Sequence, residues 1–233
     1  MSKNIVLNIP HSSVNGVFDD KIGKWTPNAH FVNDCVNKWT DWWTDMLFKV
    51  KNMENINSVV FPYSRFVCDV ERLKNDPMEE RGQGIIYTEF NGYKRNALGE
   101  MDKQFLYTLW GQHQNNLKNF LNNESVLIDC HSFPSHLSDA DICIGFNDDW
   151  SYDEKLINKI KKIFEDYAYK VRLNEPFSNA ITPDTDFCYK SLMIEVNKKV
   201  YMNEETMILN RNQRQWMRWY GCLEKIYEEI LKN

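Results

Sequence analysis

The sequence predicts an α/β fold, with a mainly parallel or mixed sheet flanked by helices. Two observations support this prediction: short apolar runs rich in branched residues, and longer amphipathic stretches that lie between them. Strands that alternate with helices usually pair in parallel, because each helix carries the chain back across the sheet. No Pro/Gly/Ser-rich linker or internal repeat interrupts this pattern, so we expect one domain over residues 1–233.

The apolar runs predict five buried strands, over residues 5–9, 58–62, 125–129, 141–146 and 192–196. The amphipathic stretches predict four helices, over residues 29–51, 102–122, 151–169 and 204–231. Residues 75–99 contain turn residues, charges and four glycines. We expect a long loop there, which either lies close to a functional site or forms ordinary surface.

The composition disfavours nucleic-acid binding and membrane insertion. The formal net charge is −5, and Lys and Arg are scattered rather than gathered in a stripe that could neutralise a run of phosphates. No stretch approaches the roughly 20 apolar residues that span a bilayer, and the amino terminus lacks the features of a signal peptide. The six widely spaced cysteines are typical of reduced thiols. We therefore expect a cytoplasmic protein whose partner is a small molecule.

Two histidines follow apolar runs in matching positions. His11 follows I-V-L-N-I-P and His131 follows V-L-I-D-C, and a serine comes after each. Ligands in open α/β sheets bind beyond the carboxyl ends of the strands, which is where both histidines are expected. A lone histidine there is usually a hydrogen-bonded structural residue, but a matched pair favours a shared metal site.

A catalytic zinc ion usually takes three protein ligands, so the site needs one more, and a carboxylate is the best candidate. Asp41 and Asp45 lie four residues apart, on one face of the predicted helix over 29–51. Asp69 and Glu71 follow another apolar run, in C-D-V-E-R-L. The alternative is ordinary: acidic residues on a helix are mostly solvated, and Asp69 could simply pair with Arg72.

Glu195 interrupts the apolar run L-M-I-E-V, where an ionised carboxylate is costly to bury without a partner. Beside a metal site it could act as general base, taking a proton from water and returning it to the leaving nitrogen. The alternative is a structural ion pair with Lys190 or Lys198.

Arginine is suited to holding a substrate carboxylate through two parallel hydrogen bonds. Arg72 is the best candidate because it follows an apolar run among acidic residues, and Arg65 lies close to it in the sequence. Asn174, in N-E-P-F, could supply a further polar contact. Phosphate-binding, dinucleotide-binding and serine-hydrolase motifs are absent from the sequence.

Together these segments resemble the N-formylglutamate amidohydrolase family, whose fold is similar to that of the zinc carboxypeptidases. Six short motifs in the family's order carry the resemblance: I-P-H-S-S at 9–13, T-D-W-W-T-D-M-L-F at 40–48, Y-S-R-F-V-C-D-V-E-R at 63–72, D-C-H-S-F-P at 129–134, N-E-P-F at 174–177 and I-E-V-N-K-K-V-Y-M at 194–202. Each motif is weak by itself, but the six together extend over most of the chain.

The resemblance implies that His11 and His131 bind one Zn²⁺ per chain, with Mn²⁺ or Fe²⁺ as alternatives. It also implies that Glu195 stands in the place of the catalytic glutamate of carboxypeptidases. Asp41 is the expected third ligand, because its segment is the more family-like, and Asp69 or Glu71 is the alternative. The implied activity is hydrolysis of the amide bond of an N-formyl- or N-acyl-amino acid by water that the metal activates.

The carboxypeptidase pattern D-x-N-R, which holds a substrate carboxylate, looks like D-V-E-R here, with Glu71 in the Asn place. A carboxylate at that position repels a substrate carboxylate unless it is protonated or paired. A substrate other than N-formylglutamate, such as a different N-acyl amino acid or a small amide, is therefore compatible with the motif. Two other functions stay open: a metallocarboxypeptidase-like peptidase or deacylase, and a non-catalytic small-molecule-binding protein on the same fold.

Overall fold

The computed structural model describes residues 3–17, 19, 25–26, 28–51 and 53–232. Its centre is a six-stranded sheet in the order β3-β1-β6-β9-β7-β8. The strands are β1 (Asn4–Ile9), β3 (Ile56–Val60), β6 (Ser125–Phe133), β7 (Ile142–Gly145), β8 (Val171–Leu173) and β9 (Lys190–Asn197). Neighbouring strands run parallel except for β7 and β9, which are antiparallel. The predicted mixed α/β fold is confirmed.

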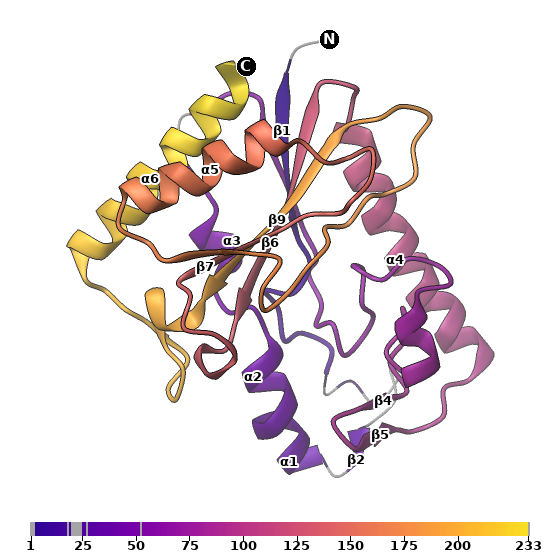
Figure 1. Cartoon of the computed structure of the whole chain (residues 1–233). Coiled ribbons are helices and arrows are strands. Elements are labelled where there is room, and N and C mark those ends of the chain that lie inside the picture. Colours follow the sequence, from indigo (N-terminus) through magenta and orange to yellow (C-terminus); the bar gives the residue numbers. More distant parts are fainter. Residues whose placement is uncertain (1–2, 18, 20–24, 27, 52, 233) are drawn as a thin grey trace.

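Helices cover both faces of this sheet. Helices α5 (Glu154–Asp166) and α6 (Gln213–Lys232) lie on one side, and α4 (Glu100–Phe120) lies on the other (Figure 1). Strand β1 shows why both faces are buried: Ile5 and Leu7 pack in the core beneath α5 and α6, whereas Val6 packs with Leu117 of α4. Successive side chains of a strand point to opposite faces, so an unbroken apolar run suits a sheet covered on both sides.

Short elements gather at the carboxyl end of the sheet. They include α1 (Asn28–Phe31), the π-helical turn η2 (Val32–Val36) and α2 (Asn37–Trp39). Helix α3 (Thr44–Leu47) follows them and lies beside β6. A three-stranded sheet of β2 (Trp25–Thr26), β4 (Glu89–Phe90) and β5 (Tyr93–Arg95) lies at the same end (Figure 1). The segment predicted as a loop, residues 75–99, therefore contains β4 and β5, together with the 3₁₀ helix η3 (Pro77–Arg81).

The single helix predicted over residues 29–51 is wrong. The chain leaves the helical conformation at Thr40, which is extended, and Trp43 has a positive φ of 66°. Contacts with distant residues hold this break: the hydroxyl of Tyr201 donates to the carbonyl of Trp42, and the indole of Trp43 donates to the carbonyl of Met207. Asp41 therefore lies in a turn between α2 and α3 and not on a helical face.

The predicted helix over 204–231 begins only at Gln213. Strands β10 (Met202–Asn203) and β11 (Ile208–Leu209) form a hairpin before it. Asparagine side chains determine both features: Asn203 accepts hydrogen bonds from the backbone of the hairpin turn, and Asn212 accepts from the backbone amides of Arg214 and Gln215. Asn212 thereby satisfies free amides at the start of α6.

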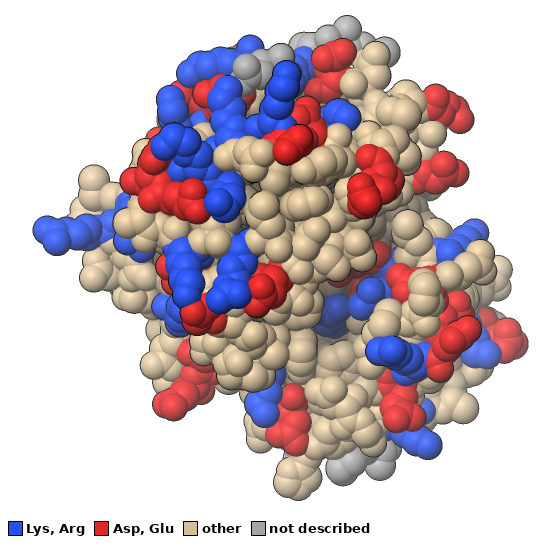
Figure 2. Space-filling model, in the orientation of Figure 1, with Lys and Arg blue, Asp and Glu red and all other residues tan. Residues whose placement is uncertain are grey.

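No helix among the described residues combines the length and apolarity needed to cross a membrane. Figure 2 shows acidic and basic side chains interspersed over one face, which is hollowed below its middle. The expectations of a single domain, a cytoplasmic location and no nucleic-acid partner stay predictions.

Candidate metal centre

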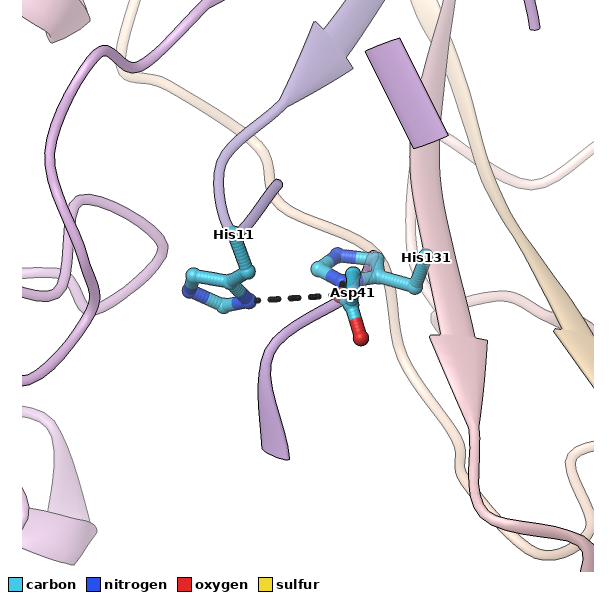
Figure 3. Close-up of side chains that lie close together, drawn as sticks. All are labelled: His11, Asp41 and His131. Atoms are coloured by element: carbon cyan, nitrogen blue, oxygen red, sulfur yellow. Dashed lines mark hydrogen bonds and ion pairs between the residues drawn. The ribbon is translucent and has the colours of Figure 1, made fainter. Parts of the chain in front are cut away.

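Three neighbouring strands bring the predicted site residues together at the carboxyl end of the sheet. His11 follows β1, His131 lies near the end of β6, and Glu195 lies in β9 directly opposite His131. Asp41 reaches the same place from the turn after α2, where its backbone amide donates to the carbonyl of His11 at 2.9 Å. Figure 3 shows the side chains of His11, Asp41 and His131 converging. All of these residues are buried.

The Nδ1 atoms of both histidines face the same carboxylate. His131 Nδ1 lies 2.9 Å from Asp41 Oδ2, and His11 Nδ1 lies 3.7 Å from the same oxygen. One nitrogen from each histidine and one oxygen of Asp41 lie within 4.8 Å of one another. Nδ1 of His11 has no hydrogen-bond partner although it is fully buried. A buried nitrogen with a free lone pair, next to a carboxylate, suits a cation ligand.

Buried carboxylates stand behind the Nε2 atoms. His11 Nε2 is hydrogen-bonded to Asp69 Oδ1 at 2.8 Å, whereas His131 Nε2 lies 3.2 Å from Asp129 Oδ1 without a hydrogen bond. Asp129 is itself fixed by the side-chain amide of Asn8 at 2.7 Å and by the backbone amide of Ile181. A carboxylate behind a histidine fixes the ring's orientation and makes its other nitrogen a better ligand. The residues present thus fit a metal ion.

Glu71 touches the same pair of histidines. One of its oxygens lies 3.0 Å from His131 Nε2 and the other lies 3.7 Å from His11 Nδ1. Two further groups that could hold a cation are therefore His11 with Asp69 and Glu71, and His131 with Glu71 and Asp129. The structure brings Asp41, Asp69 and Glu71 to the histidines, whereas Asp45 is exposed on α3. The choice of Asp41 as third ligand stays a prediction.

The carboxylates and His131 shift each other's pKa values. Burial raises the pKa of Asp41, but the two neighbouring histidines outweigh burial and hold the pKa well below its usual value. Burial lowers the pKa of His131, yet Glu71 and Asp129 outweigh it and raise the pKa above its usual range. Positive charge at this point is therefore stabilised by an excess of carboxylates, which favours a cation there.

Glu195 is 7% exposed, and its Oε2 atom has no hydrogen-bond partner. Burial raises the pKa of Glu195 to about 8, while the positive charge of His131 opposes the rise. Within the described residues no ion pair joins Glu195 to Lys190 or Lys198, because both ammonium groups donate to backbone carbonyls instead. The structural ion pair considered for Glu195 is therefore not formed.

A cavity of about 330 Å³ opens at this centre, and both Arg65 and Arg72 line it. Arg65 Nη2 lies 3.2 Å from Asp69 Oδ2 and 3.2 Å from the hydroxyl of Tyr87. Arg72 is held more loosely, with Nε 3.7 Å from Asp69 Oδ2, and its side chain is 23% exposed. Arg72 is thus the arginine better placed to meet a ligand.

Asn174 does not line this cavity. It lies in the turn after β8, where its Oδ1 atom accepts a hydrogen bond from the backbone amide of Phe146 at 2.9 Å. Asn174 also has a positive φ of 54°, a conformation that asparagine tolerates well. Its position explains the residue as part of a turn and gives no support to substrate binding.

Sequence reasoning missed two residues of the centre, Asp129 and Tyr87. Asp129 interrupts the apolar run V-L-I-D-C, so the signal that singled out Glu195 was present there too. Tyr87 is fully buried and its hydroxyl donates to Asp69. It lies in a segment without strand or helix periodicity, and only the folded chain brings it to Asp69.

The fold and the site define a class before any comparison is made. Histidines and carboxylates that meet in a cavity at the carboxyl edge of an α/β sheet are typical of hydrolases that use a bound cation. Comparison with known proteins makes this class specific. A model of the N-formylglutamate amidohydrolase family matches residues 4–202. The chain belongs to this family and is a hydrolase of the amidohydrolase type.

Solved structures show the same fold. An N-formylglutamate amidohydrolase from Ralstonia eutropha JMP134 superposes with a TM-score of 0.79 at 16% identity, covering 99% of this chain and 95% of that one. A gene product of Agrobacterium tumefaciens superposes with a TM-score of 0.67 at 15% identity, covering 98% and 92%. No curated protein matches the sequence. The likeness to zinc carboxypeptidases stays a prediction.

Proposed function

We propose that the protein is a zinc-dependent hydrolase that cleaves the amide bond of an N-formyl- or other N-acyl-amino acid. One observation carries the proposal: His11 and His131 turn their Nδ1 atoms toward Asp41, while buried carboxylates back their Nε2 atoms. Family membership supports the reaction type. Histidine nitrogens with a carboxylate oxygen form a ligand set that zinc prefers, and Mn²⁺ or Fe²⁺ is compatible with it.

His11, Asp41 and His131 would hold the ion, and Asp69 and Asp129 would orient the two rings. A bound Zn²⁺ supplies two kinds of chemistry: it polarises the amide carbonyl and it makes water a better nucleophile at neutral pH. Everything else in the reaction falls to side chains of this chain.

Glu195 is the proposed general base. Its unpartnered Oε2 atom can accept the proton of the attacking water, and the same carboxyl can then protonate the nitrogen of the leaving amino acid. In the metal-free protein burial holds the pKa of Glu195 above its usual value, which favours a carboxyl that can donate a proton as well as accept one. The oxygen of the water becomes bonded to the acyl carbon as the C–N bond breaks.

Arg72 is the residue proposed to bind the substrate carboxylate, and Arg65, which lines the same cavity, is proposed to assist it. In the motif D-V-E-R, the carboxylate of Glu71 would repel a substrate carboxylate unless it is protonated or paired. In the structure Glu71 lies 3.0 Å from His131 Nε2 and 3.7 Å from His11 Nδ1. The carboxylate of Glu71 thus faces the histidines of the centre, which supports binding of a substrate carboxylate at Arg72.

The test is metal analysis of the purified, zinc-supplied protein together with hydrolysis of a panel of N-formyl and N-acetyl amino acids. We expect about one zinc ion per chain and almost none in His131→Ala. His30→Ala, which changes an exposed histidine of α1, is the matched control and should keep the metal. A parent that takes up no zinc, or a His131→Ala variant with unchanged zinc, would contradict the proposed centre.

A further inference from the structure

A second cavity of about 460 Å³ adjoins the first. The two share Trp39, Asn91 and Pro134 in their linings, so these residues form the boundary between them. Two of these boundary residues are close in sequence to residues of the centre. Trp39 comes two residues before Asp41, and Pro134 comes three residues after His131. A ligand that leaves the centre past Trp39 therefore enters the second cavity.

A row of aromatic rings gives the first cavity a direction. The Tyr87 hydroxyl lies 3.2 Å from Arg65, and the Tyr87 ring stacks on Phe90 with ring centroids 5.7 Å apart. Phe90 in turn meets Trp39 edge to face, with centroids also 5.7 Å apart. All four residues line the cavity. The row runs from the arginine end to the boundary with the second cavity.

Charged side chains are numerous in the lining of the second cavity. Its lining includes three acidic residues, Asp34, Glu204 and Glu205, and three basic ones, Lys38, His136 and Lys198. Peptide groups and charged termini gain hydrogen bonds and ion pairs there.

Lys198 is a buried charged residue in the lining of this cavity. It lies in the 3₁₀ helix η5 (Lys198–Val200), is only 2% exposed, and donates a hydrogen bond to the carbonyl of Lys38. An ammonium group has three donors, and a buried one is costly unless acceptors meet it. Within the described residues, Lys198 Nζ makes one hydrogen bond, to the carbonyl of Lys38. A carbonyl or carboxylate of a ligand is a suitable further acceptor.

Glu204 is a second charged residue in the lining whose side chain has defined contacts. Both of its carboxylate oxygens lie 3.2 Å from the backbone amide of Ser135, directly after Pro134. This contact ties the β10–β11 hairpin to the segment that follows β6.

We propose that the acyl half of the substrate extends past Trp39 into the second cavity and is a short peptide. This inference rests on the proposed function, since it takes the amino-acid carboxylate to lie at Arg72. The enzyme would then release the carboxyl-terminal amino acid from a short peptide. Water adds its hydroxyl to the acyl carbon and its hydrogen to the leaving nitrogen, so no co-reactant is needed.

The experiment compares kcat/KM of the zinc-loaded protein for three substrates with the same carboxyl-terminal residue: an N-formyl amino acid, an N-octanoyl amino acid and a tripeptide. We expect the tripeptide to exceed each of the others by at least about tenfold, the effect of one hydrogen bond to a charged group. Lys198→Met should lower the ratio of tripeptide to N-formyl activity by about the same factor.

His136→Trp is the second variant, because Lys198 is buried and its replacement could prevent folding. His136 is exposed, and an indole there should obstruct the cavity and lower the same ratio. Lys162→Met, on the exposed side of α5, is the control and should leave the ratio unchanged. Faster cleavage of the N-formyl or N-octanoyl substrate than of the tripeptide would overturn this inference and leave the proposed function standing. Failure to hydrolyse any of the three would overturn both.

Discussion

His131 and Glu195 are directly opposite one another in the parallel pair of β6 and β9. Opposite residues on neighbouring strands project from the same face of the sheet, so the register alone places the candidate ligand and the candidate base side by side. Slipping β9 by one residue would replace Glu195 with an apolar neighbour and turn its carboxylate to the other face. Packing of the strand's apolar residues in the core thereby fixes the spacing of these two candidate groups.

Glu195→Gln tests the proposed base. Glutamine keeps the shape of the side chain but accepts no proton, so we expect kcat to fall by about 10²- to 10⁴-fold, the usual contribution of general acid–base catalysis. Bound zinc, measured by elemental analysis, should stay at the parent's level because Glu195 is not a proposed ligand. Parent-like kcat in a metal-loaded Gln variant would assign the proton transfer to another group.

The raised pKa of Glu195 predicts a pH dependence of stability in the metal-free protein. The unfolded carboxyl titrates near 4.5 and the folded one near 8. Between these values the folded state binds the extra proton, so the free energy of unfolding falls as pH rises through this window. His131, whose pKa is also raised, adds to the same trend.

Urea unfolding of the metal-free protein at pH 5.5 and pH 8.5 measures this fall. We expect Glu195→Gln, which has no proton to lose, to reduce it by more than about 1 kcal/mol, since one pKa unit corresponds to about 1.4 kcal/mol. An equal fall in both proteins would mean that Glu195 does not titrate in this range.

Asp129→Asn tests the carboxylate behind His131. Asparagine keeps a polar side chain there but removes the charge that orients the ring, so zinc affinity should weaken by about 10- to 100-fold. Competition with a chelator of known affinity measures the change. Asp148→Asn, on the exposed loop after β7, is the control and should bind zinc as the parent does. Unchanged affinity in Asp129→Asn would leave Asp129 with a purely structural role.

Much of the fold could be predicted from the sequence because the central strands are buried on both faces. The apolar runs placed β1 and β9 within two residues of their observed bounds, but β6 was expected to end at 129 and extends to Phe133. His131 therefore lies inside a strand and not after it. Its polar neighbours Asp129 and Ser132 hide the continuation, because periodicity counts apolar residues and these are polar residues buried at the site.

The site was less predictable where tertiary contacts override local pattern. The tryptophan-rich segment around Asp41 has helical periodicity, yet contacts with Tyr201 and Met207, more than 150 residues away in the chain, break the helix there. The same break points Asp41 at the histidines, whereas the sequence pattern predicts a position on a helical face. Functional sites are where such conflicts between local preference and final structure are expected.

Arg72→Met tests the substrate anchor and separates binding of the carboxylate from the chemical step. The methionine keeps apolar bulk but removes the donors, so KM for an N-acyl amino acid should rise by at least about tenfold, the loss of a charge-assisted hydrogen bond.

The matched substrate is the same compound with its carboxylate replaced by a carboxamide. Its KM should change little, because a neutral amide gains far less from a guanidinium. Steady-state kinetics of both substrates with parent and variant give the comparison. An equal rise for both would show that Arg72 supports the shape of the cavity through Asp69 and Asp76, from which it lies 3.7 and 3.8 Å, and not the substrate carboxylate.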